Sequence, residues 1–257
     1  PHFPYQTPDD AAKVITNFQD GDRATYARMV EALDSAVGEI LDYLVRNDLE
    51  QNTLVIFTSD NGPVIDDGYK DDAKEKLGTH RAAGPWRGGK YSIFEGGTRV
   101  PFLVRWPGRV QPGVSDALMS QVDFPATFAA LAGKTFSTNT APDTRNHLAA
   151  LLGDTRTGRA DLIEHSGGLA VRQGQWKFIP KRPGLKRLQN TDTETGNDPE
   201  VQLYDLVTDP GETRNVAKEH PDKVQALTAI LEQEKAKGME AAPPPRNNAR
   251  RAASEAQ

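Results

Sequence analysis

Two adjacent side chains that carry oxygen ligands, Asp60 and Asn61, come directly after a run of apolar and β-branched residues. That run, residues 53–58, predicts a buried strand, and we expect it to pair in parallel with its neighbours. Gly62 and Pro63 predict that the strand ends here, so both side chains could face one ion. Carboxylate and carboxamide oxygens are ligands that calcium prefers. The same residue types also form ordinary turns, so a metal site and a plain strand-ending turn are the two alternatives.

A glycine-rich loop further along the chain presents a lysine. Lys90 lies between Gly89 and Tyr91. A lysine held in such a loop could reach an oxyanion as a point charge. The alternative is an ordinary solvated lysine.

The same loop contains two arginines and a glycine pair. Arg87 is a candidate for contacts with an anionic substrate, and Arg99 could either do the same or pair with Glu95. Gly96 and Gly97 predict either a backbone conformation that other residues avoid or a close approach to a ligand.

Three of the five histidines are candidate site residues. His2 lies in a segment with three prolines in eight residues, which predicts an extended chain; it could be a proton donor or an anion ligand. His80, in the long loop before the glycine-rich loop, and His165, at the end of a predicted strand, could line a substrate cleft. His147 and His220 are interpreted as surface or capping residues.

Composition excludes several other functions. The chain of 257 residues has no cysteine, so it has no disulfide, thiolate metal site or cysteine nucleophile. A net charge of −5 without a basic block argues against a nucleic-acid surface, and no apolar run is long enough for a membrane span. No zinc-type histidine spacing or Ser-His-Asp order stands out. The chain starts at Pro1 rather than a methionine, which we interpret as a processed or excerpted sequence.

The elements that position these candidates form two groups. The first is an α/β pattern of two helices, two strands and a short apolar turn: residues 24–47, 53–58, 100–106, 124–132 and 147–152. Asp123 is the expected N-cap of the second helix, and Gly133 is expected to end it.

The second group of elements predicts a small antiparallel sheet covered by a helix. It comprises four short strands and one amphipathic helix: residues 161–165, 169–172, 175–179, 201–206 and 221–237. We therefore predict an α/β domain over 1–153, a small α+β subdomain over 154–240 and a disordered tail over 241–257.

Taken together, these motifs closely resemble the sulfatase family, the type I enzymes of the alkaline-phosphatase-like superfamily. The matching runs of the central stretch are residues 58–63, 87–90, 94–101 and 106–108. Further similar segments are residues 1–4, 26–44, 170–178, 203–206 and 209–212, with Asp123 and Asn215. The resemblance implies part of a mixed or parallel sheet flanked by helices, followed by the antiparallel subdomain.

The resemblance also assigns roles to residues. It implies that Asp60 and Asn61 hold part of one calcium ion, that Lys90 contacts the sulfate, and that His2 binds sulfate or protonates the leaving oxygen. His2 and Lys90 are then the catalytic candidates. His80, Arg87 and His165 remain the candidates for substrate contacts.

One departure from the family pattern is large. The Cys/Ser-x-Pro-x-Arg motif, whose first residue becomes the formylglycine nucleophile, and the upstream acidic pair of the metal site are both missing. The sequence thus resembles the C-terminal half of a sulfatase, with formylglycine expected in a missing N-terminal half. We expect the intact parent, periplasmic or secreted, to hydrolyse a sulfated glycan or small molecule and this chain alone to be inactive. The alternatives are a phosphoryl or phosphonate hydrolase of the same superfamily and a non-catalytic binding module.

Overall fold

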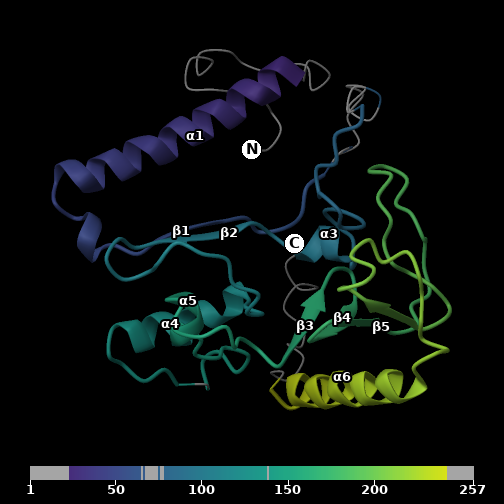
Figure 1. Cartoon of the computed structure of the whole chain (residues 1–257). Helices are drawn as coiled ribbons and strands as arrows, with labels where there is room; N and C mark the ends of the chain where they lie inside the picture. Colours follow the sequence, from purple (N-terminus) through teal and green to yellow (C-terminus); the bar gives the residue numbers. More distant parts are fainter. Residues whose placement is uncertain (1–22, 65, 67–74, 76–77, 138, 242–257) are drawn as a thin grey trace, which may run out of the picture.

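The computed structural model describes residues 23–64, 66, 75, 78–137 and 139–241 (Figure 1). The predicted role of His2 and the predicted disordered tail therefore lie outside the described residues. The N-terminal elements in chain order are α1 (Arg23–Arg46), the 3-10 helix η2 (Glu50–Asn52), β1 (Val55–Thr58), α3 (Glu95–Thr98), β2 (Phe102–Arg105), the 3-10 helix η3 (Gln121–Asp123), α4 (Phe124–Leu131) and α5 (Leu148–Leu151). The C-terminal elements are β3 (Asp161–His165), β4 (Leu169–Gln173), β5 (Trp176–Ile179), β6 (Gln202–Asp205) and α6 (Pro221–Ala241).

The strand that precedes Asp60 pairs in the opposite sense to the one expected. β1 and β2 form a two-stranded antiparallel sheet in which Val55 faces Arg105 and Thr58 faces Phe102. The expectation of a parallel pairing for this strand is wrong within the described residues. An antiparallel pair needs no crossover helix, and the helix named among the described residues between the two strands is the single turn of α3. A short apolar run does not distinguish the two pairings.

The predicted N-terminal helix is present, within one residue of its expected ends. α1 lies across the β1–β2 pair, away from the C-terminal sheet (Figure 1). The described residues leave much of its apolar face uncovered: the exposed fraction is 40% for Val30, 38% for Leu33 and 58% for Ile40. No helix among the described residues is long and apolar enough to cross a membrane.

The C-terminal elements form the antiparallel sheet that the sequence predicts. The strand order is β3-β4-β5-β6, and each neighbouring pair is antiparallel. Gly174, with φ of 57°, makes the tight turn between β4 and β5. Along each strand alternate side chains face opposite sides of the sheet. On one side the strands pack against α6 in a core that includes Val171, Phe178, Leu203, Leu227 and Leu231.

The other side of this sheet holds the glycine-rich loop in place. Ile93 and Phe94 of the loop are buried together with residues of β4, β5 and β6, among them Ile179 and Tyr204. The rings of Phe94 and Tyr204 meet edge to face with centroids 6.0 Å apart. The loop that carries Lys90 is thus anchored on the C-terminal sheet. The boundaries at residues 153 and 240 stay predictions.

Candidate active site

The two loops that carry the candidate metal and anion ligands are joined by backbone hydrogen bonds. The amide of Lys90 donates to the carbonyl of Pro63 over 2.8 Å, and the amide of Gly62 donates to the carbonyl of Gly97 over 3.0 Å. These bonds place Asp60 and Asn61 beside the glycine-rich loop although about thirty residues separate them from Lys90 in the sequence. The structure therefore brings together the residues that the sequence nominates for metal and for sulfate.

The glycines at this junction allow one backbone to approach another. A Cβ atom added to Gly62 would lie 1.8 Å from the carbonyl oxygen of Gly96, and one added to Gly97 would lie 2.2 Å from that of Ser92. Neither glycine has a positive φ. Gly96 and Gly97 have no positive φ, so an avoided backbone conformation does not explain them; both approach neighbouring backbone, and a close approach to a ligand stays a prediction. A larger residue at either position would separate the two loops.

An open groove with a volume of about 2210 Å³ collects most of the candidate residues. Its lining includes Asp60, Asn61, Lys90, Tyr91 and His165. The volume exceeds that of a typical small-molecule pocket. His80 is exposed but is not among the residues that line it.

Asp60 and Asn61 offer the oxygen ligands that calcium prefers, but two side chains are too few to complete its coordination. The amide nitrogen of Asn61 donates to the carbonyl of Gly62 over 2.9 Å, so its side-chain oxygen is the atom left for a ligand. Asp60 is exposed on the groove beside it. Calcium takes six to eight oxygen ligands. Within the part of the chain that the structure describes, no group of three or more His, Cys, Asp or Glu side chains could hold a metal ion.

Arg87 faces the C-terminal sheet instead of the groove. Its guanidinium donates to both carboxylate oxygens of Glu194 over 2.8 and 3.1 Å and to the carbonyl of Glu212 over 2.7 Å. It also lies 4.1 Å from the centre of the Phe94 ring. The hydrogen bond with Glu194 raises the pKa of Arg87. These contacts give Arg87 a role in holding the loop, and its predicted substrate contact stays a prediction.

Arg99 pairs with Glu95, as one of the two sequence interpretations has it, with a nitrogen–oxygen distance of 3.3 Å. Its guanidinium carbon also lies 4.1 Å from the centre of the Trp86 ring, and both residues line the groove. His147, interpreted as a surface or capping residue, stands at the N-cap position of α5 but makes no capping bond with its side chain. That side chain is largely buried 4.0 Å from Asp123, and burial lowers its pKa.

Asp123 itself is more than a helix cap. It is fully buried and accepts two hydrogen bonds from the Arg159 guanidinium, over 2.8 and 2.7 Å. Asp123 occupies the N-cap position of α4, but its side chain makes no capping hydrogen bond to that helix. Instead it belongs to the capping box of the preceding η3, where its carboxylate accepts a hydrogen bond from the backbone amide of Ser120.

A buried cluster of charges beneath the glycine-rich loop was not anticipated from the sequence. Lys177 of β5 has no exposed surface and donates to Glu95 over 3.1 Å and to Glu164. Arg172 of β4 contacts the second oxygen of Glu95 over 2.7 Å. The backbone amide of Glu95 donates to the carboxyl of Glu212 over 2.7 Å. Glu95 belongs to α3, whereas its partners Lys177, Arg172 and Glu212 belong to the C-terminal part of the chain, so these contacts fix α3 on the C-terminal sheet.

Burial and neighbouring charges act against each other in this cluster. Burial would lower the pKa of Lys177, but Glu164 and Glu95 reverse this and raise it. Burial would raise the pKa of Glu95, but Lys177 and Arg172 lower it. For Glu212 burial prevails and raises the pKa to about 8. Glu212 is therefore protonated at neutral pH, while Lys177 and Glu95 are charged.

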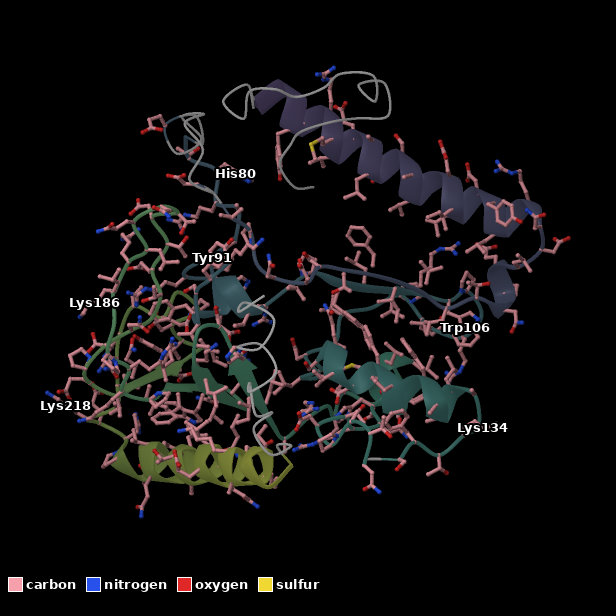
Figure 2. The ribbon with its side chains drawn as sticks, turned by 180° about the vertical axis from the view of Figure 1, so that it is seen from behind. His80, Tyr91, Trp106, Lys134, Lys186 and Lys218 are labelled. Atoms are coloured by element: carbon pink, nitrogen blue, oxygen red, sulfur yellow. The ribbon has the colours of Figure 1, made fainter. Side chains whose placement is uncertain are left out.

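Tyr91 is the residue of the groove that the sequence analysis missed. It follows Lys90 in a tight turn closed by a 2.9 Å hydrogen bond from the amide of Ser92 to the carbonyl of Gly89. Its φ of 75° lies in the left-handed region, which costs a residue with a side chain about 1–2 kcal/mol. Its ring is 49% exposed, and Lys90 Nζ lies 5.5 Å from the ring centre. Figure 2 shows Tyr91 beside α3 and His80 farther out on the same loop. The only signal in the sequence is a bulky residue where the loop is otherwise rich in glycine.

The fold and this arrangement define an alkaline-phosphatase-like α/β protein, as comparison with known proteins shows. The family model described as Sulfatase matches residues 1–134, and the chain belongs to the sulfatase family. An N-acetylgalactosamine-6-O-sulfatase of Bacteroides thetaiotaomicron is 46% identical over 210 residues, which are 81% of this chain and 41% of that protein. Human arylsulfatase A is 34% identical over 227 residues, 81% of this chain and 43% of that protein.

A solved structure supports the same conclusion. It comes from work on the metabolism of multiple glycosaminoglycans by Bacteroides thetaiotaomicron. It matches with a TM-score of 0.79 at 46% identity and covers 82% of this chain and 45% of that chain. The chain spans about two-fifths of the length of the curated relatives it matches.

Proposed function

We propose that these residues form part of a sulfuric ester hydrolase that removes sulfate from a sugar. The observation that carries the proposal is the single groove that holds Asp60, Asn61 and Lys90 together. The names of the relatives, an N-acetylgalactosamine-6-O-sulfatase and an arylsulfatase, support a sulfate ester as substrate. Because the 46% identical relative carries the sugar name, we propose a 6-O-sulfated N-acetylhexosamine within a glycan, and a periplasmic or secreted location.

Each candidate residue has a distinct role in this proposal. Lys90 supplies a fixed positive charge that holds the sulfate in the ground state and in the transition state. Asp60 and Asn61 would supply two oxygen ligands to a calcium ion, which when bound offsets the negative charge of the sulfate oxygens. His2 would donate a proton to the departing alcohol oxygen. His165, His80 and Arg87 stay candidates for substrate contacts.

The nucleophile has to be supplied from outside these 257 residues. The family uses formylglycine made from a cysteine or serine in a defined motif, and neither a cysteine nor that motif is present. We therefore propose hydrolysis for a longer protein that includes this chain. The missing nucleophile also favours a second candidate function for the chain alone, a module that binds sulfated glycans without hydrolysing them.

The experiment compares the longer protein with the chain alone on 6-sulfated N-acetylgalactosamine and on a matched phosphate ester. We expect turnover of the sulfate ester by the longer protein only, and a large loss with Lys90→Ala. His2→Ala should slow the sugar sulfate about a hundredfold or more and slow an activated aryl sulfate much less, because only the poor leaving group needs the proton. Preferred turnover of the phosphate ester would favour a phosphoryl hydrolase, and binding without turnover would favour the binding module.

A further inference from the structure

Tyr91 occupies a backbone position that does not suit a tyrosine. The hydrogen bond from Ser92 to Gly89 makes Lys90 and Tyr91 the two central residues of a β-turn. A positive φ at the second central residue is typical of a type II turn, where glycine or asparagine is the usual choice. Burial offsets little of this strain, because about half of the side chain is exposed. The fold of the turn therefore gives no reason for an aromatic ring here.

The position of the ring does give a reason. Tyr91 lines the same groove as Asp60, Asn61 and Lys90, and its ring lies beside the Lys90 ammonium. The turn is rigidly held, since the amide of Lys90 is bonded to Pro63 on one side and the side chain of Ser92 is fully buried on the other. An aromatic ring on this held backbone, next to Lys90, is a platform for whatever group carries the anion.

The other aromatic side chains of this loop, Phe94 and Trp86, are less available: Phe94 is buried. One face of the Trp86 ring is covered by the Arg99 guanidinium at 4.1 Å, and Trp86 is only partly exposed. The Lys90 ammonium lies over the Tyr91 ring at the longer distance of 5.5 Å, and Tyr91 is more exposed than Trp86. An aromatic ring with two side-chain torsions supplies such a face at a small loss of conformational entropy.

We propose that Tyr91 is a specificity-determining residue whose ring packs against the sugar that bears the sulfate while Lys90 holds the sulfate itself. This inference rests on the proposed sulfatase function. A pyranose ring presents C–H groups on its face, and these pack on the face of an aromatic side chain, as other apolar groups do. The strained turn directs the ring toward the sugar, because a residue in the ordinary right-handed or extended conformation would send its side chain elsewhere.

The test uses two substitutions in the longer, active protein. Tyr91→Asn removes the ring but suits the left-handed backbone, so the melting temperature should stay unchanged or rise by about 2–4 °C. The KM for 6-sulfated N-acetylgalactosamine should rise about three- to tenfold, the effect expected for one aromatic contact. The inhibition constant of inorganic sulfate, which has no sugar, should change by less than about twofold. Tyr91→Phe keeps the ring and should leave all three values near those of the wild type.

Each result decides between the alternatives. An unchanged KM in Tyr91→Asn would overturn the inference and leave the sulfatase function standing. An equal loss of affinity for inorganic sulfate and for the sugar would also overturn it, since Tyr91 would then act only through Lys90. A wild-type protein that neither hydrolyses the ester nor binds sulfate would refute the sulfatase function, and the inference with it. A lower melting temperature would show that Tyr91 serves the fold.

Discussion

At the scale of single residues, Glu212 is the group whose environment changes its chemistry most. Its carboxyl is fully buried, with a φ of 50°, and one carboxyl oxygen has no hydrogen-bond partner among the described residues. The charged groups around it are Lys177, Glu95 and Glu164. Because burial raises the pKa of Glu212 to about 8, the folded protein holds a proton that the unfolded chain releases near the ordinary glutamate value of 4.5.

The sign of the resulting pH dependence follows from proton linkage. Between about pH 4.5 and pH 8 the folded state binds more protons at this site than the unfolded state does, so Glu212 makes stability fall as pH rises. We expect Glu212→Gln to remove this contribution, so the variant should gain stability relative to the wild type as pH rises from 5.5 to 8. Urea unfolding at both pH values measures it, with exposed Glu219→Gln as the control. An unchanged difference between wild type and variant across this range would contradict the raised pKa.

At the scale of elements, the contact between α3 and β5 depends on a buried lysine. Lys177→Met would leave Glu95 and Glu164 without their shared cation in a buried site. Removing one partner of a buried ion pair costs about 3–5 kcal/mol. We expect a loss of that size in the free energy of unfolding, together with faster amide exchange over residues 89–98, because the loop with Lys90 is anchored through α3.

A matched control keeps this prediction specific. Lys186→Met removes a lysine whose side chain is 70% exposed and which, among the described residues, forms an ion pair with Asp198, so it should change stability by less than about 0.5 kcal/mol. Equal effects of the two substitutions, or a loss of stability in Lys177→Met without faster exchange in the loop, would show that the cluster does not hold the glycine-rich loop.

The elements also show where sequence reasoning succeeds and where it stops. The helix α1 and the strands of the C-terminal sheet have strong periodicity and clear turn residues, so their ends agree with the prediction within a few residues. The helix α3 was missed because Gly96 and Gly97 are poor helix formers, and only tertiary contacts fold that single turn.

Some residues of the candidate site can be predicted from the sequence, and others cannot. Asp60, Asn61 and Lys90 stand in recognisable motifs, so the sequence nominates them and the structure places them on one groove. Lys177 gives no such signal, because a lysine in a strand is ordinarily solvated and its burial depends on acidic partners 13 and 82 residues away. The strain at Tyr91 is a property of the turn and cannot be seen in the residue type.

At the scale of the whole molecule, the calcium site that we propose needs more ligands than Asp60 and Asn61. Asp60 and Asn61 offer two side-chain oxygen ligands, and the described part of the chain has no group of three or more His, Cys, Asp or Glu side chains that could hold a metal ion. We expect these 257 residues to bind calcium with a dissociation constant of about 1 mM or weaker, the low end of the range for protein sites. Titration calorimetry measures this, with Asp60→Ala as the comparison. Micromolar affinity that disappears in Asp60→Ala would contradict the prediction.

We expect the core of the C-terminal sheet and α6 to contribute more to the free energy of unfolding than α1 does. A buried apolar core lies between the C-terminal sheet and α6, where Leu231 is only 1% exposed. α1, by contrast, leaves Ile40 58% exposed and stands apart from that sheet (Figure 1). Leu231→Ala should therefore cost about 2–5 kcal/mol in the free energy of unfolding, through lost burial and the cavity left behind. Ile40→Ala should cost less than about 0.5 kcal/mol in the chain as given.

Hydrogen exchange makes the same distinction without mutation. Amides of β4, β5 and α6 should exchange only through global unfolding, whereas those of α1 should exchange at a lower opening free energy, because few apolar contacts hold it. If Ile40→Ala proves as costly as Leu231→Ala, or if α1 is protected as strongly as the sheet, then α1 packs on residues outside the described ranges. In that case the apolar face of α1 belongs to the same cooperative core as the C-terminal sheet.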